Sequence, residues 1–296
     1  MSPETWAQHM DAEAQRLSAY VVGFVLPVLV PQNPIGGEIV PPEAHLGGSG
    51  TLVEVNGLKG VLTAAHVADG IEHHKTDVGL ILTKYRARVP HQVLFKPKYC
   101  RHVSIPDLKA SGKLQWSMMG PDIAFIVLPP EATASAVGAK SFYNLSKRNT
   151  EMLEPRDTSP EEALVISGFA AEWTKEEVAQ EPFKRVVVFN GRAMGPLDIT
   201  HRWSDNGFDY FHFEARRGEG YDGPADFSGY SGSGVWQIVT AESEKGFEVK
   251  ERLLVGVAFR QSDLISRNGR ESREISCHGS KSIYGDLINK IGSTGR

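Results

Sequence analysis

The chain has 296 residues, about twice the size typical of one domain, so we expect two compact units or one large one. Hydrophobic residues make up 41% and charged residues 23%, an ordinary globular composition that excludes a wholly disordered, collagen-like or coiled-coil chain. The formal net charge of −4 gives no general attraction to phosphate backbones, so nucleic acid is not an expected partner.

Cysteine content and hydropathy bear on location. Cys100 and Cys277 allow at most one intramolecular disulfide, far fewer than a disulfide-stapled secreted domain carries. The longest apolar run, residues 20–30, contains Pro27 and is shorter than the ~20 residues that a membrane helix needs. The residues before this run are more acidic than basic, unlike an export signal. We therefore expect a cytoplasmic protein with no membrane partner.

The first half of the chain begins with a helical pattern and continues with strands. Residues 1–19 form a predicted N-terminal extension, helical over 3–19, because Trp6, Met10 and Leu17 recur at helical spacing. Six strand-like runs follow, separated by glycine and proline: 20–29, 50–55, 60–64, 78–83, 92–95 and 123–128. These runs predict a first domain at residues 20–130.

A stretch rich in Pro, Ser and Asn, residues 131–162, interrupts the pattern and is interpreted as a linker. Six further strand-like runs follow: 163–169, 185–190, 210–214, 235–239, 252–259 and 274–277. They predict a second domain at 163–280, and residues 281–296 contain an amphipathic helix over 281–292. Short strands at regular intervals predict an all-β protein built of sandwiches or barrels.

A serine lies among three glycines in the segment 229–234, GYSGSG, just before a strand-like run. Glycine adopts positive φ at little cost, so such a turn can expose the Ser231 hydroxyl beside free backbone N–H groups. A plain Gly/Ser hairpin loop explains the same segment without any chemistry.

A histidine and an aspartate complete a candidate catalytic set. His66 ends the apolar run 61–67, and a neutral imidazole can take a proton from a serine hydroxyl near pH 7. Asp122 leads into the apolar run 123–128, where its carboxylate could fix the imidazole tautomer. A structural histidine at a strand end and an ordinary Pro-Asp turn are the alternatives, and Asp77 competes with Asp122 for the same role.

The segments around His66, Asp122 and Ser231, in this order, resemble the three signature segments of chymotrypsin-like (trypsin-like) serine peptidases, and the likeness covers roughly residues 20–292. The resemblance implies two six-stranded antiparallel β-barrels with the site between them. It also implies a serine endopeptidase that acts on protein or peptide substrates, with Ser231 as nucleophile, His66 as general base and then acid, and Asp122 orienting it. The backbone N–H groups of Gly229 and Ser231 would form the oxyanion hole.

The sequence departs from this family at two informative positions. Secreted members often carry a cysteine where Val67 stands, and digestive members carry an aspartate where Tyr230 stands. Both departures favour an intracellular, bacterial-type member that is not activated by N-terminal trimming. Such an enzyme needs restraint, so we expect a regulatory protein partner or a gating segment, either residues 196–230 or the N-terminal helix. The alternative function is a catalytically silent module that kept the peptidase fold and binds a partner.

Substrate preference depends on the residues around the serine. Asp226 at or near the pocket floor would select Lys or Arg, although an exposed loop aspartate is the simpler interpretation, and Arg260 would instead repel basic side chains. We expect no cofactor. The segment 72–74 (EHH) lacks metal-ligand spacing, and the segment 48–50 (GSG) lacks the rest of a nucleotide-binding motif.

Overall fold

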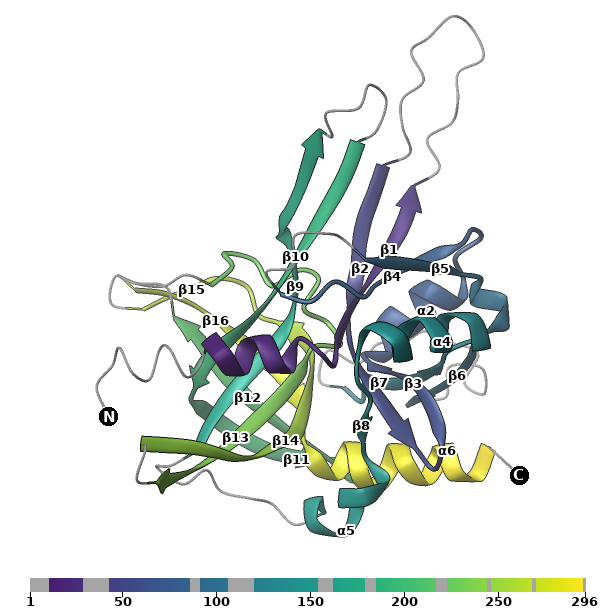
Figure 1. Ribbon diagram of the computed structural model, residues 1–296. Helices are drawn as coiled ribbons and strands as arrows, with labels where there is room; N and C mark the ends of the chain where they lie inside the picture. The colour runs from purple at the N-terminus through teal and green to yellow at the C-terminus, as the bar shows by residue number, and fades with distance from the viewer. Residues whose placement is uncertain are drawn as a thin grey trace, which may run out of the picture.

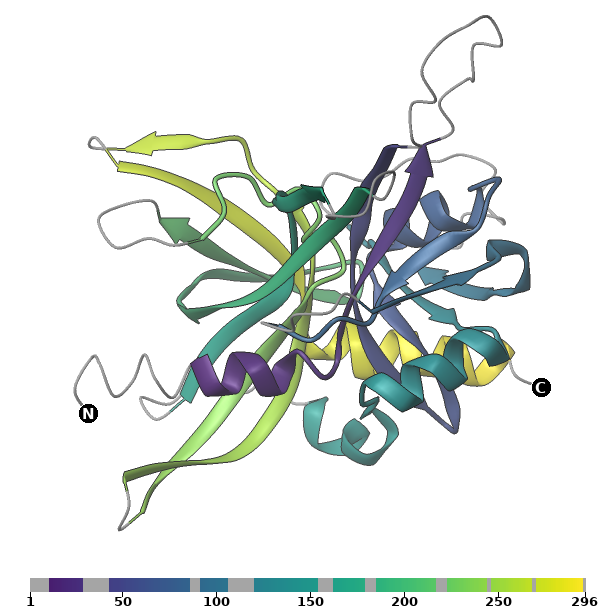
Figure 2. The same ribbon diagram turned by 45° about the horizontal axis from the view of Figure 1, so that its top comes forward.

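The computed structural model describes residues 11–28, 43–85, 91–105, 120–153, 162–178, 185–216, 223–243, 246–267 and 270–294. These residues form two large, mainly antiparallel sheets that lie side by side (Figure 1; Figure 2). The prediction of a mostly β protein is therefore confirmed. Among the described residues, no helix is long and apolar enough to cross a membrane.

The first sheet has the strand order β5-β4-β1-β2-β3-β7-β6, and the short β8 pairs in parallel with β2. Its strands are β1 (Val21–Val28), β2 (Glu43–Val55), β3 (Leu58–Thr63), β4 (Val78–Ile81), β5 (Gln92–Phe95), β6 (Arg101–Ile105), β7 (Ile123–Val127) and β8 (Tyr143–Asn144). The two end strands, β5 and β6, follow each other in the chain and are joined through the single turn η1 (Pro97–Tyr99).

The second sheet has the strand order β10-β9-β13-β14-β16-β12-β11, and β15 pairs with β16. Its strands are β9 (Glu162–Val178), β10 (Arg185–Leu197), β11 (Ile199–Asp205), β12 (Phe208–Arg216), β13 (Gly234–Ser243), β14 (Gly246–Gln261), β15 (Ile265–Arg267) and β16 (Arg270–His278). The end strands β10 and β11 are again consecutive, with Asp198 alone between them. Within the described residues no ladder joins the end strands of either sheet, so barrel closure stays a prediction.

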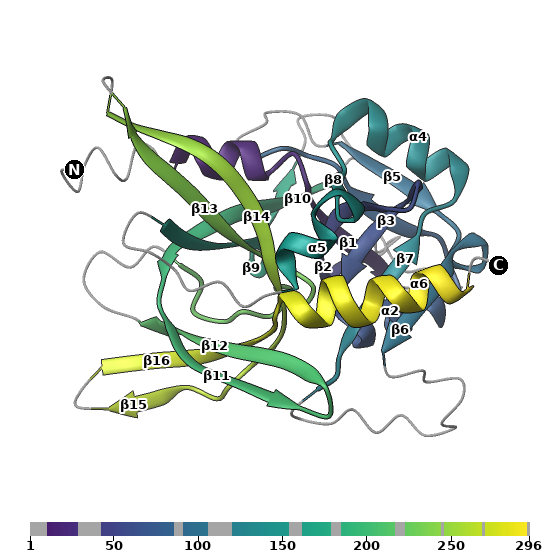
Figure 3. The same ribbon diagram turned by 90° about the horizontal axis from the view of Figure 1, so that it is seen from below.

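Helices occupy the connections and the chain ends. The expected linker contains α4 (Pro130–Ala139), η2 (Ser146–Arg148) and α5 (Asn149–Met152), and α2 (Ala65–Glu72) follows β3. At the N-terminus residues 11–17 are helical, whereas Trp6 and Met10 lie outside the described residues. The C-terminal segment forms η3 (Ser282–Leu287) and α6 (Ile288–Thr294), which lie across the lower end of the first sheet (Figure 3).

One hydrophobic cluster joins the two sheets and both terminal helices. It contains Leu62 and Phe125 from the first sheet and Trp236 from the second, all fully buried. Leu17 from the N-terminal helix and Ile283 from η3 pack into the same cluster. Because burying side chains of this size stabilises a fold by roughly 1.5–3 kcal/mol each, the two sheets are held together by a shared core.

Candidate active site

His66 lies at a junction between a strand and a helix. The sequence predicts an apolar strand that ends in this histidine, but β3 ends at Thr63 and His66 is the second residue of α2. That expectation was wrong in detail because Ala65, Val67 and Ala68 bury one face of a helix rather than continuing the strand. The turn leaves the His66 side chain 36% exposed, so its imidazole can reach a substrate.

Asp122 holds His66 through both of its carboxylate oxygens. Nδ1 of His66 lies 2.6 Å from Oδ2 of Asp122, and the backbone N–H of His66 donates to Oδ1 at 2.9 Å. A carboxylate oxygen accepts, so this contact places the ring proton on Nδ1 and leaves Nε2 as the proton acceptor. Asp77 is exposed at the start of β4, so it is Asp122 that bonds the imidazole.

A second histidine, which the sequence analysis did not single out, holds Asp122 from behind. The backbone N–H of Asp122 donates to Nε2 of His278 at 2.8 Å. His278 is fully buried against the rings of Tyr210 and Phe259, each with its centroid 4.9 Å away. Burial lowers the pKa of His278 to about 4, so the ring is neutral and Nε2 can accept.

The loop that carries Ser231 is fixed to the first sheet. The backbone N–H of Ser49 donates to the carbonyl of Ser231 at 2.8 Å, and the Ser49 hydroxyl donates to the carbonyl of Gly229 at 2.7 Å. Gly229 and Gly232 have φ values of +92° and +89°, which L side chains rarely adopt. The glycines thus permit the tight turn that the sequence predicts around Ser231.

His66 and Ser231 line one cleft of about 270 Å³. The walls come from β2, from the start of α2, from the serine loop and from the ends of β14 and β16. The lining residues are Gly47, Gly48, His66, Phe227, Ser228, Gly229, Tyr230, Ser231, Ala258, Arg260, Gln261 and Ile275. The structure therefore brings Ser231 and the His66–Asp122 pair to the same place between the two sheets.

Two backbone N–H groups of the serine loop are candidate donors to a substrate oxygen. The N–H groups of Gly229 and Ser231 make no hydrogen bond to any residue in the described part of the chain, whereas the intervening N–H of Tyr230 donates to the Phe227 carbonyl at 2.9 Å. Gly229 and Ser231 both line the cleft. Two free amides beside a nucleophile can stabilise the negative oxygen of a tetrahedral intermediate.

The two candidate selectivity residues lie differently. Arg260 lines the cleft, but Asp226 is not among its lining residues. The Asp226 carboxylate accepts from the Ser228 N–H at 2.6 Å and from Nε2 of Gln261 at 2.9 Å. Hydrogen bonding to the Ser228 side chain and to Gln261 lowers the pKa of Asp226 to about 2. Asp226 thus contacts Gln261, which lines the cleft, without lining it itself.

The described residues contain no group of three His, Cys, Asp or Glu side chains that could hold a metal ion. The chemistry available in the cleft is that of a hydroxyl, an imidazole held by a carboxylate, and backbone amides. This set suits acyl transfer through a covalent intermediate.

Comparisons with known proteins give no family. The chain matches no protein-family model, and no curated protein is significantly similar to it. A solved structure from work on the coupled folding and binding of the intrinsically disordered Sesbania mosaic virus VPg protein is 13% identical, with 91% of this chain and 90% of that chain covered and a TM-score of 0.35. The Bacillus subtilis inhibitor of motility MotI is 8% identical over 94% and 98%, with a TM-score of 0.15. The function is therefore inferred from this chain's own residues.

Proposed function

We propose that this protein is a serine endopeptidase that hydrolyses peptide bonds through an acyl-enzyme on Ser231. The observation that carries the proposal is the 2.6 Å contact between Nδ1 of His66 and Oδ2 of Asp122, with His66 and Ser231 lining one cleft. Three residue types that act together in acyl transfer come from segments far apart in the chain and meet at one place.

The proposed reaction has two halves, formation of the acyl-enzyme and its hydrolysis, and the same groups act in both. Nε2 of His66 takes the Ser231 hydroxyl proton as Oγ attacks the substrate carbonyl, and the N–H groups of Gly229 and Ser231 bind the oxygen that becomes negative. His66 then gives the proton to the leaving amine. Water repeats the sequence on the acyl-enzyme, while Asp122 stabilises the imidazolium in both steps.

The strand order supports the two-barrel architecture that accompanies this function. In each sheet the two end strands are consecutive in the chain, β5 with β6 and β10 with β11. If two consecutive end strands act as one bent strand, that strand pairs with both edges of the sheet. The seven strands of the order then form a closed barrel of six. We include both barrels in the proposal, with the cleft between them.

The proposal also includes a cytoplasmic location. Cys100 is half-buried and Cys277 is buried, and both are free thiols. Free cysteines suit a reducing compartment, where packing rather than a disulfide holds the fold.

A library of unmodified peptides tests the activity without assuming a cleavage preference. We expect mass spectrometry to find new termini after incubation with the protein and none with Ser231→Ala. The matched control is Ser228→Ala, which removes another hydroxyl from the same cleft and should still cleave. Cleavage that survives in Ser231→Ala would overturn the mechanism, and binding of peptides without cleavage would favour the silent binding module.

A further inference from the structure

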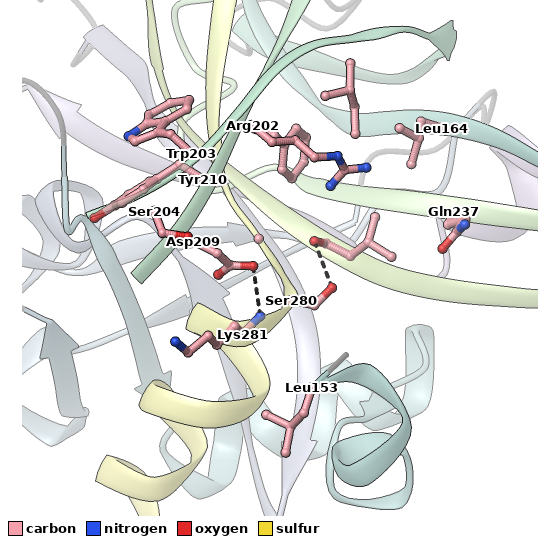
Figure 4. Close-up of a pocket in the computed structure, with 14 residues that line it drawn as sticks. Leu153, Leu164, Arg202, Trp203, Ser204, Asp209, Tyr210, Gln237, Ser280 and Lys281 are labelled. Atoms are coloured by element: carbon pink, nitrogen blue, oxygen red, sulfur yellow. Dashed lines mark hydrogen bonds between the residues drawn. The ribbon is translucent and has the colours of Figure 1, made fainter. Parts of the chain in front are cut away.

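A second, larger cavity lies away from the serine cleft, under the β11–β12 hairpin. Its volume is about 440 Å³, within the range of small-molecule sites. Arg202 and Leu153 lie on opposite sides of it, with Gln237 toward one end and Trp203 with Tyr210 toward the other (Figure 4). Neither His66 nor Ser231 lines it. The proposed peptidase chemistry leaves this cavity unused.

The walls of the cavity are largely apolar and firmly placed. Leu164 and Phe211 are buried, and Val255 and Ile199 continue the surface beside them. Leu153, which is 41% exposed, covers the side formed by α5. Such walls would hold an apolar chain or ring, because binding one removes their apolar surface from water.

The charged groups in the cavity favour an anion. Arg202 and Lys281 both line it, and neither lies within ion-pair distance of a carboxylate of a described residue. The one carboxylate among the lining residues, Asp209, is already occupied: it accepts from the backbone N–H and hydroxyl of Ser282, both at 2.7 Å, and from the Lys281 N–H at 3.1 Å. The charge of Lys281 also acts on Asp286, and Asp209 serves the start of the C-terminal helix. Arg202, which lies over the Phe211 ring at 6.0 Å from its centroid, is thus the cation available to a ligand.

The aromatic groups argue against a nucleotide. Trp203 stacks on Tyr210 with a centroid distance of 5.1 Å and on His201 with a distance of 5.6 Å. Because these ring faces are engaged with one another, they offer no platform for a base. Asp209 repels an anion in proportion to its charge, so it opposes a doubly charged phosphate more than a singly charged carboxylate. A single negative charge on an apolar body fits the cavity better.

We propose that this cavity binds an amphipathic carboxylate, either a free acid with an apolar chain or a peptide C-terminus with an apolar last residue. Arg202 binds the carboxylate through its planar fork of donors, and the apolar part lies along Leu164, Phe211 and Val255. Gln237, which is 2% exposed, lines the inner end.

Isothermal titration calorimetry of the full chain tests whether the cavity binds such a carboxylate. The chain carries Ser231→Ala so that a peptide probe is not consumed, which makes the result independent of the peptidase proposal. The probes are decanoate, decanol, acetyl-Ala-Ala-Leu-Phe as its free acid, the same peptide as its amide, and AMP. We expect at least one acid to bind about tenfold or more tighter than its uncharged counterpart. The tighter of the two acids identifies the source of the carboxylate.

Variants locate the binding. Arg202→Gln should weaken the better acid about tenfold or more, whereas Arg101→Gln, which removes an exposed arginine on β6, should not change it. Ser204 is exposed on β11 and lines the cavity, so Ser204→Trp should fold and block the site by filling it. The proposal would be overturned if no probe bound up to 1 mM or if acid and uncharged probes bound equally well. It would also be overturned if Arg202→Gln left the affinity unchanged, or if AMP bound more tightly than both acids.

Discussion

The backbone N–H of Asp122 donates to Nε2 of His278 across 2.8 Å, so a buried histidine from the end of β16 fixes the residue that fixes His66. The bond connects the second sheet to the loop that enters β7 in the first. The geometry of the proposed site thus depends on a contact between the two sheets as well as on the residues that react.

His278 should act as a positioning residue. In His278→Leu the buried N–H of Asp122 loses its acceptor, which costs about 1–3 kcal/mol. The readout is covalent labelling of Ser231 by a serine-reactive fluorophosphonate. We expect the labelling rate at saturating reagent to fall about tenfold or more, with little change in the reagent concentration that gives half this rate. His278→Gln supplies a carbonyl oxygen and should recover most of the rate. Equal loss in both variants would show that His278 serves packing alone.

The same histidine predicts a pH dependence of stability. Its pKa is about 4 in the folded protein and 6.5 ordinarily, so the unfolded chain binds more protons between these values. This pKa difference contributes about 3 kcal/mol to the free energy of unfolding. The contribution is fully present above pH 6.5 and is lost as the pH falls toward 4. Urea unfolding at pH 7, 5.5 and 4.5 should show a shallower pH dependence in His278→Gln than in the parent protein. Parallel curves would contradict this account.

Asp122→Asn should preserve the fold and lose reactivity. An amide in place of the carboxylate favours the wrong imidazole tautomer and removes the charge that stabilises the imidazolium. We expect the labelling rate of Ser231 to fall by about 10³–10⁴, with an unfolding midpoint close to that of the parent protein. Asp77→Asn is the matched control, and a rate within threefold of the parent for Asp122→Asn would remove Asp122 from the mechanism.

Gly232 should tolerate no side chain. Its φ is +89°, and a Cβ there would meet the carbonyl of Ser49 and the hydroxyl of Thr63. Gly57 has a similar φ of +83° but open space around it. Chemical denaturation should therefore show a loss of about 1 kcal/mol for Gly57→Ala and at least 2 kcal/mol more for Gly232→Ala, because only the latter adds a clash to the strain. Similar losses at both positions would mean that the serine loop is not clamped.

Much of the fold is predictable because buried strands leave a simple pattern. The residues of β7 are apolar throughout, and the run 123–128 predicts them almost to the residue. In β11 the pattern fails because most side chains face solvent, among them Thr200 and His201. In β6 only Val103 and Ile105 are buried, which is too few to mark a strand in the sequence. The helix α4 was interpreted as a linker because of its prolines, yet Pro130 begins it, a position that suits proline.

The site is predictable only in part. His66, Asp122 and Ser231 each stand in a local context that suggests a role, and the structure places His66 on Asp122 and in the cleft of Ser231. His278 has no such local signal, because the run before it, 274–277, alternates polar and apolar residues. Its function depends on β16 lying beside β14 and β12, which no local pattern shows.

Covalent labelling tests the central claim most directly. The protein is treated with a fluorophosphonate at neutral pH, and the modified residue is located by peptide mass spectrometry, with Ser228→Ala as a control that keeps Ser231. The account predicts a single adduct on Ser231 that disappears in Ser231→Ala and forms far more slowly in His66→Ala. A folded protein that forms no adduct, or an adduct at another serine that persists in Ser231→Ala, would contradict it.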